Sequence, residues 1–299
     1  MNKHMALSAS AMVAALVTTT PAQAQMPTGW LNQVDGLAIY QGSADLDNGG
    51  DFTATRTFLR GTALFKFDNG NSAGLSVNFG QFDYEFSQAS TQPWNDIRDI
   101  RISTPVRLQL GERASLFAAP QVRWDYQRGA DASDGVTAGL FAGASWEISD
   151  SLTLGPAFGA FSQLEESELQ FFPALLVDWD ISDRWNLNTG SGLGATGGPG
   201  LTLKYAYNDK LDLSLSARAE SVRFRLDDVG VAPDGVGEDD SIPVVVAISY
   251  APNPGMSFNV FAGAEFNGEL SLDDANGNQI SSQSYDTAPI FGGSFRIRF

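Results

Sequence analysis

The chain has 299 residues, a formal net charge of −17, no cysteine and a single histidine, His4. A protein this acidic is a poor partner for nucleic acid, whose phosphates repel carboxylates. Without cysteine there are no disulfides and no thiolate metal sites, and without histidine beyond residue 4 the usual general base and the commonest metal ligand are missing. We therefore expect no metal site, no cofactor and no enzymatic activity, since Ser-His and Cys-His catalysis are excluded.

The N-terminus has the layout of a secretory signal peptide. Lys3 lies in a short polar head, an apolar run extends from Met5 to Val17, and Ala22-Gln23-Ala24 provides small residues before a cleavage site. We expect residues 1–24 to be removed and residues 25–299 to form one domain, because no linker or shift in composition divides them. No segment approaches about 18 uninterrupted apolar residues, which excludes an α-helical membrane protein.

From about Val34 onward the chain alternates apolar and polar residues, the period-two pattern of β-strands. Tight turns are expected at residues 68–71, 111–113, 149–151, 182–184, 208–210 and 252–255. Longer polar connections are expected at residues 43–51, 87–95, 129–135, 163–168, 195–198, 227–240 and 273–284. Six short turns alternating with seven long loops require about fourteen strands, with both ends of the domain on the short-turn side.

This rhythm predicts an all-β fold, a transmembrane antiparallel up-and-down β-barrel of about 14 strands, within a range of about 12 to 16. The residues after Met256 illustrate the two faces: Val260 and Phe266 would meet lipid, while Glu265 and Glu269 would face the lumen. Aromatic residues gather near the short turns, as in the girdle at a membrane interface. Breaks in the pattern near residues 80–81 and 220–221 predict bulges, or points where a strand rises above the membrane.

The last residues of the chain form the clearest two-faced strand. Phe295, Ile297 and Phe299 alternate with Arg296 and Arg298. Together with the signal peptide and the alternating hairpins, this ending resembles the outer-membrane β-barrel proteins of Gram-negative bacteria. In that family the barrel-assembly machinery reads a final strand that ends in phenylalanine, so the resemblance implies that the three apolar residues are an assembly signal. It also implies the bacterial outer membrane as location, with outer-membrane lipid and lipopolysaccharide as partners.

Charged residues on the inward face of the predicted strands are the candidate functional residues. Arginines gather on the first five strands and the last one, and carboxylates on the sixth, eighth and thirteenth. The predicted lumen residues are Arg60, Arg101, Arg107, Arg123, Arg218, Arg296, Arg298, Glu147, Asp178, Asp180 and Glu265. A basic arc opposed to acidic ones would set a transverse field that orients solutes and tunes ion preference. The alternative is a salt-bridge network that fills the barrel.

The predicted strand number favours a channel, because side chains just fill a barrel of about eight strands and a wider one leaves space. We expect a passive, porin-like channel for small hydrophilic solutes or ions with a mixed-charge lumen. The alternative function is a non-conducting structural or surface-recognition barrel that acts through its extracellular loops. The loops, which do not reach much beyond about a dozen residues and are not rich in exposed aromatic residues, argue mildly against that alternative.

Overall fold

The computed structural model describes residues 28–88, 92–166, 168–189 and 199–299. The predicted signal peptide, residues 1–24, lies outside the described residues. Within them, no helix is long and apolar enough to cross a membrane.

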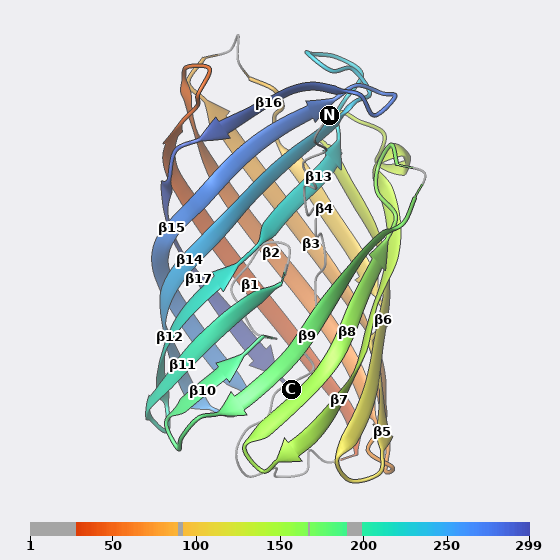
Figure 1. Cartoon of the computed structure of the whole chain (residues 1–299), viewed down its shortest axis with the longest axis vertical. Helices are drawn as coiled ribbons and strands as arrows, with labels where there is room; N and C mark the ends of the chain where they lie inside the picture. Colours follow the sequence, from red (N-terminus) through yellow and green to blue (C-terminus); the bar gives the residue numbers. More distant parts are fainter. Residues whose placement is uncertain (1–27, 89–91, 167, 190–198) are drawn as a thin grey trace.

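The described residues form one sheet of seventeen strands that closes on itself (Figure 1). The strands are β1 (Gly29–Asp45), β2 (Asp51–Lys66), β3 (Ser72–Phe86), β4 (Ile97–Ser103), β5 (Val106–Leu110), β6 (Ala114–Gln127), β7 (Val136–Ser149), β8 (Leu152–Phe161), β9 (Gln170–Asp180), β10 (Trp185–Asn188), β11 (Gly200–Asn208), β12 (Leu211–Arg218), β13 (Glu220–Arg225), β14 (Val236–Asn253), β15 (Met256–Asp273), β16 (Gln279–Tyr285) and β17 (Ala288–Arg298), with one short 3₁₀ helix, η2 (Ala132–Gly135).

Three pairs of these strands are single wall strands with a short break. β4 and β5 are separated by two residues, β12 and β13 by Ala219, and β16 and β17 by two residues. The wall therefore consists of 14 antiparallel strands, as the turn pattern predicted. The six short turns lie at one end of the barrel, as predicted, and the longer connections among the described residues lie at the other (Figure 1). The predicted loop at residues 195–198 lies outside the described residues.

The last strand closes the cylinder against the first. β17 pairs with β1 from Gln33↔Arg298 to Gln41↔Ile290, and β15 flanks it on the other side. Phe295 and Ile297 point outward, and Arg296 and Arg298 point inward, as the alternation predicted. The ring of Phe295 lies over Gly36 of β1, where an added Cβ would stand 2.2 Å from its Cε1. The ring can pack over this junction of β1 and β17, the seam of the barrel, because residue 36 has no side chain.

The outer face of the wall carries an apolar band. Leu59 on β2 and Leu75, Val77 and Phe79 on β3 are all exposed and all point away from the lumen. Aromatic side chains form the expected girdle near the short turns, and its exposed members are Phe67, Trp146, Trp179, Trp185, Tyr207, Tyr250, Phe258 and Phe299. A band of this kind is what a barrel presents to lipid.

One side of the barrel projects beyond the apolar band at the long-loop end. On β3 the outward residues change from Phe79 to Gln81, Asp83 and Glu85, while the ladder to β2 and β4 runs on through Gly80. The break in pattern near residue 80 is therefore a strand leaving the membrane, with no bulge. Two loop predictions were wrong for the same reason: β14 already starts at Val236 and β16 occupies 279–285, because strands above the membrane need no apolar outer face.

β15 does contain a bulge, which shifts its two faces. Asp240↔Glu269 and Ile242↔Phe266 are paired, so two residues of β15 stand opposite one of β14, and Asn267 adopts a left-handed φ of 51°. Beyond the bulge Leu270 is buried inside, whereas Glu269 is exposed and accepts a hydrogen bond from Ser282. The prediction that Glu269 faces the lumen was therefore wrong.

The barrel is pinched at the long-loop end. Even along the shorter way round the wall, the six strands β7 to β12 separate β6 from β13, yet the two meet in parallel at Arg225↔Tyr126. An apolar core fills the space that this contact encloses. It includes Phe52, Phe82, Phe224 and Leu270, with Trp94 of the β3–β4 loop inserted edge-on against Phe224 at 5.0 Å between ring centroids. At this end the inward side chains of the described residues are packed together, so the predicted wide lumen is not found here.

Candidate functional site: the charged barrel interior

The predicted basic arc forms a continuous row across the wall. The strand registers place Arg296 opposite Asp35, Asp35 opposite Arg60, and Arg60 in line with Asn78 and Arg101. Arg101 in turn stands opposite Arg123 on β6. The row runs from β17 through β1 to β6, so arginines that are distant in sequence share one register on the inward face.

Asp35 joins the two ends of the chain within this row. Its carboxylate accepts hydrogen bonds from Nε of Arg296 at 2.6 Å and from Nη2 of Arg60 at 3.0 Å. Gln33 donates to the same carboxylate and accepts from Nε of Arg298 at 2.9 Å. Polar inward side chains at this level are therefore linked by hydrogen bonds that cross the seam.

Charged side chains near the short turns are in contact with water although they point inward. The side chain of Arg296 is 37% exposed and that of Lys204, which pairs with Asp212 at 3.7 Å, is 44% exposed. Asp178 and Asp180 both accept hydrogen bonds from Nδ2 of Asn186, at 2.7 and 3.0 Å. An inward side chain can be wet only if the lumen is hollow at its level.

Glu147 and Arg107 belong to the same wet region. Both point inward near the short turns, where Glu147 is exposed and Arg107 half-buried, and they interact electrostatically. The acidic residues expected on β7 and β9 thus do face the hollow part of the lumen. With Arg107, Lys204 and Arg296 nearby on the inward face, the region carries both signs.

Farther from the short turns the interior charges are dry. Arg101 and Arg123 both contact Oδ2 of Asp99, at 3.1 and 3.2 Å, and Arg123 also contacts Oδ2 of Asp125 at 2.9 Å. Asn78 donates to the other oxygen of Asp99. The side chain of Arg101 is only 2% exposed. The register places residues of like charge directly opposite each other on β4 and β6. The favourable contacts between opposite charges are therefore those along one strand and those diagonally between the two strands.

A second dry cluster links β2 to β15 along the inner side of the wall, across β1 and β17. Arg56 donates to both oxygens of Glu265 and, through Nη2, to Asp239 at 3.3 Å and Gln41 at 2.7 Å. The hydroxyls of Tyr84 and Tyr285 complete it by donating to Asp239 at 2.8 and 3.0 Å. This cluster lies directly beneath the apolar core, so it closes the polar interior where that core begins.

The predicted lumen residues therefore fall into two groups. Arg60, Arg107, Arg296, Arg298, Glu147, Asp178 and Asp180 line the hollow part, whereas Arg101, Arg123, Arg218 and Glu265 are inside the barrel but buried. The burial of the second group differs from the expected water-filled lining. The pinch between β6 and β13 removes water from this level, and Arg101, Arg123 and Glu265 form ion pairs there, as in the alternative interpretation of a salt-bridge network.

Sequence reasoning missed several members of these clusters. Arg56 lies two and four residues before inward positions of β2, so the same parity that identified Arg60 would have found it. The role of Asp35 could be predicted only if the pairing of β1 with β17 were known, because its partners come from β2 and β17. Asp239 was assigned to a loop, and no local pattern links it to Arg56, from which it is separated by 183 residues.

A solved channel structure shares this architecture. Over 94% of this chain and 100% of the other, the barrel superposes on an outer membrane channel from Pseudomonas putida F1 with a TM-score of 0.51 and 11% identity. The fold is that of the outer-membrane β-barrels. The apolar band and the girdle on its outer face are what such a barrel presents to lipid.

Two further matches are weaker. A FadL homologue from Pseudomonas aeruginosa aligns over 91% of this chain and 90% of its own, with a TM-score of 0.46 and 12% identity. The toluene transporter TodX from P. putida aligns over 91% of each chain, with a TM-score of 0.45 and 10% identity. No protein-family model and no curated protein matches the chain.

Proposed function

We propose that the barrel is a passive channel for small hydrophilic solutes or ions. The exposure of Arg296 and Lys204 is the observation that supports it most directly, because these side chains point inward and are still wet. A protein whose only task was structural would gain stability from an interior packed with side chains. Charges of both signs around the hollow region would orient dipolar solutes and adjust ion preference.

A specific observation favours the second candidate, a non-conducting barrel. The apolar core around Phe224 and the Arg56 cluster occupy the interior at the long-loop end. If this end never opens, the hollow region is a closed vestibule and the protein acts through its surface. The two candidates therefore differ in whether the pinched end admits water.

Single-channel recording separates them. The refolded protein is inserted into a planar bilayer, and stepwise current is expected if it is a channel; a silent bilayer containing verified folded protein would reject this function. The variant Lys204→Ser, combined with Arg296→Ser, removes two wet positive charges and should move the reversal potential in a salt gradient toward cation preference. Arg113→Ser, which removes an exposed charge at a short turn, is the matched control and should leave the reversal potential unchanged.

Assembly by the bacterial machinery is part of the same proposal. Phe299 is exposed at the end of the chain, and Phe295 and Ile297 stand on the outer face of the closing strand. These are the positions at which an assembly receptor could read the unclosed strand. Phe299→Ala should lower the amount of barrel in the outer membrane and leave refolding in detergent unaffected, whereas equal losses in both assays would indicate a purely structural role.

A further inference from the structure

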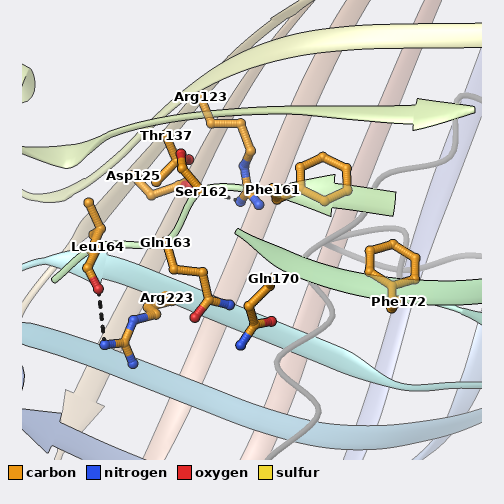
Figure 2. A pocket seen from close by; sticks show the side chains of 10 residues that line it. All are labelled: Arg123, Asp125, Thr137, Phe161, Ser162, Gln163, Leu164, Gln170, Phe172 and Arg223. Atoms are coloured by element: carbon orange, nitrogen blue, oxygen red, sulfur yellow. Dashed lines mark hydrogen bonds and ion pairs between the residues drawn. The ribbon is translucent and has the colours of Figure 1, made fainter. Parts of the chain in front are cut away.

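Two small spaces among the inward side chains differ in the charges that line them. The first lies where the inner wall of β6 to β9 approaches β13, and it is the pocket of Phe161 and Phe172 (Figure 2). Asp125 lines it together with Arg123 and Arg223, so this pocket has charges of both signs. The second space lies on the inner wall of β2 to β6, and we call it the β2–β6 pocket. Its polar lining consists of Arg60, Ser76, Asn78, Arg101, Ser103 and Gln121. Two guanidinium groups and no carboxylate therefore line the second space.

The β2–β6 pocket lies between two rows of inward residues. The strand registers place Arg60 and Arg101 in the row farther from the short turns, and Ser103 and Gln121 in the row nearer to them. The side chain of Arg60 is 21% exposed, whereas that of Arg101 is 2% exposed. The pocket is therefore next to the hollow part of the lumen on one side and next to the dry charges on the other. Away from water, the attraction between a cation and an anion is stronger.

Buried donors of this lining have no partner. Arg101 donates to Asp99 through Nη2, but its Nε and Nη1 donate to no described residue. The same is true of Nε2 of Gln121, a residue that is 6% exposed. Buried donors without an acceptor cost free energy, most of all when they belong to a charged group. An acceptor held in the pocket would recover part of that cost.

The row of arginines that crosses the wall from β17 to β6 has an excess of positive charge. Its four guanidinium groups form ion pairs with three carboxylates, Asp35, Asp99 and Asp125. Arg60 and Arg101, the two arginines that line the pocket, each share their carboxylate with another arginine. The electrostatic field in the β2–β6 pocket therefore attracts an anion and repels a cation.

We propose that the β2–β6 pocket binds a chloride ion. Its enclosed part has room for about one water-sized occupant, and chloride is only slightly larger than a water molecule. Phosphate, sulfate and organic acids are too large for this space. A water molecule would bring no negative charge to the two arginines and would need acceptors for its own hydrogens. The inference names an ion for the proposed channel and rests on that function for its role in transport, but the binding itself can be measured without conduction.

The line width of the chloride NMR signal tests the site, because chloride that exchanges onto a protein relaxes faster. With the barrel refolded in a nonionic detergent, we expect excess broadening that bromide removes by competition. Gluconate, an anion too large for the pocket, should leave the broadening in place. Gln121→Glu puts a carboxylate of almost the same shape beside Arg101, so the excess broadening should be lost. Gln279→Glu, the same change at an exposed residue of β16, is the matched control and should keep it.

Unfolding in urea gives a second measurement, which a purely structural role of Gln121 would not explain. Chloride that binds only the folded barrel stabilises it. The urea midpoint of the unchanged barrel should therefore be higher in sodium chloride than in sodium gluconate at equal ionic strength. In Gln121→Glu the internal carboxylate replaces the ion, so the midpoint should not depend on the anion and should be no lower than that of the unchanged barrel in gluconate. Retained heat-dependent mobility on a gel verifies that each variant is folded.

Three outcomes would overturn the proposal: no excess broadening by the folded barrel, broadening that persists in Gln121→Glu, or displacement by gluconate as effective as that by bromide. The last result would mean diffuse attraction by the exposed cations of the hollow region. The measurements are independent of the recordings in planar bilayers. A barrel that conducts but does not bind chloride in this pocket would refute the site and leave the channel intact. A barrel that binds chloride and never conducts would do the reverse.

Discussion

Arg56 on β2 and Glu265 on β15 form an ion pair inside the barrel, with both terminal nitrogens of the arginine donating to the carboxylate. Two strands, β1 and β17, lie between β2 and β15 in the wall. The pair therefore ties the first hairpin to the last one across the seam. Both side chains are almost completely buried, and Asp239 shares the same arginine.

Replacing Arg56 should destabilise the barrel strongly. In Arg56→Ala the carboxylates of Glu265 and Asp239 would remain buried without their cation, a situation that typically costs about 3–5 kcal/mol. Urea unfolding in lipid vesicles, followed by tryptophan fluorescence, measures the loss. Arg113→Ala, which breaks an exposed pair with Asp150 at 3.9 Å, should change the unfolding free energy by less than about 1 kcal/mol. Equal effects of the two substitutions would contradict this account of the cluster.

Arg225 holds three long loops together. Its Nε donates to the carbonyl of Asp134 at 3.0 Å, Nη1 donates to the carbonyl of Asp234, and Nη2 pairs with Glu165, which has a left-handed φ of 60°. Removing the guanidinium should release the β8–β9 loop. Leu164 of that loop is 5% exposed, so Leu164→Cys should react slowly with a water-soluble maleimide and much faster when Arg225→Gln is added.

The chain has no native cysteine, which makes this labelling assay unambiguous. Leu169 is 66% exposed, so Leu169→Cys is the control and should label rapidly in both backgrounds. Slow labelling of Leu164→Cys with and without Arg225 would mean that the loop is held by other contacts.

Gly36 should be intolerant of even a methyl group. A Cβ at this residue would overlap the ring of Phe295, 2.2 Å from its Cε1, and the ring would have to leave the seam. We expect Gly36→Ala to cost about 1–3 kcal/mol, the usual range for overpacking. Gly61→Ala is a matched control, because nothing lies within 4 Å of a Cβ added there. The comparison is made by the same urea titration, and similar stabilities of the two variants would argue against the seam contact.

Asp274 should titrate below the ordinary range of an aspartate. Hydrogen bonds from the side chain and backbone of Asn278 and from the backbone of Asn276 stabilise its carboxylate and lower its pKa. A group with a lowered folded-state pKa stabilises the turn at pH values above its unfolded pKa, and that contribution is lost as the pH falls through the folded pKa. A carboxyl-carbon NMR titration in micelles measures the pKa directly. In Asn278→Ala the pKa should rise toward 3.8; no change would show that Asn278 is not the cause.

Local features of the sequence are enough to predict the outline of this protein. Period-two alternation, the six tight turns and the closing Phe295-Arg296-Ile297-Arg298-Phe299 were sufficient for the strand number, the orientation of the hairpins and the two faces of most strands. These features are local, because neighbouring residues on a strand must point to opposite sides whatever the rest of the chain does. For the same reason the inward side of Arg60, Arg101 and Arg296 could be predicted.

Which inward residues contact water depends on how distant strands pack together. Arg101 and Arg296 have the same local pattern, yet one is buried and the other is in contact with water, because β13 bends in to meet β6 at one end of the barrel only. The same bend brings Arg223 to the pocket of Phe161 and Phe172. The bulge at Asn267, which moves Glu269 outside, and the pairing of Arg56 with Asp239 likewise depend on neighbours that are distant in sequence. Local alternation places a side chain on a face of the wall, but the packing of separate strands determines what that face meets.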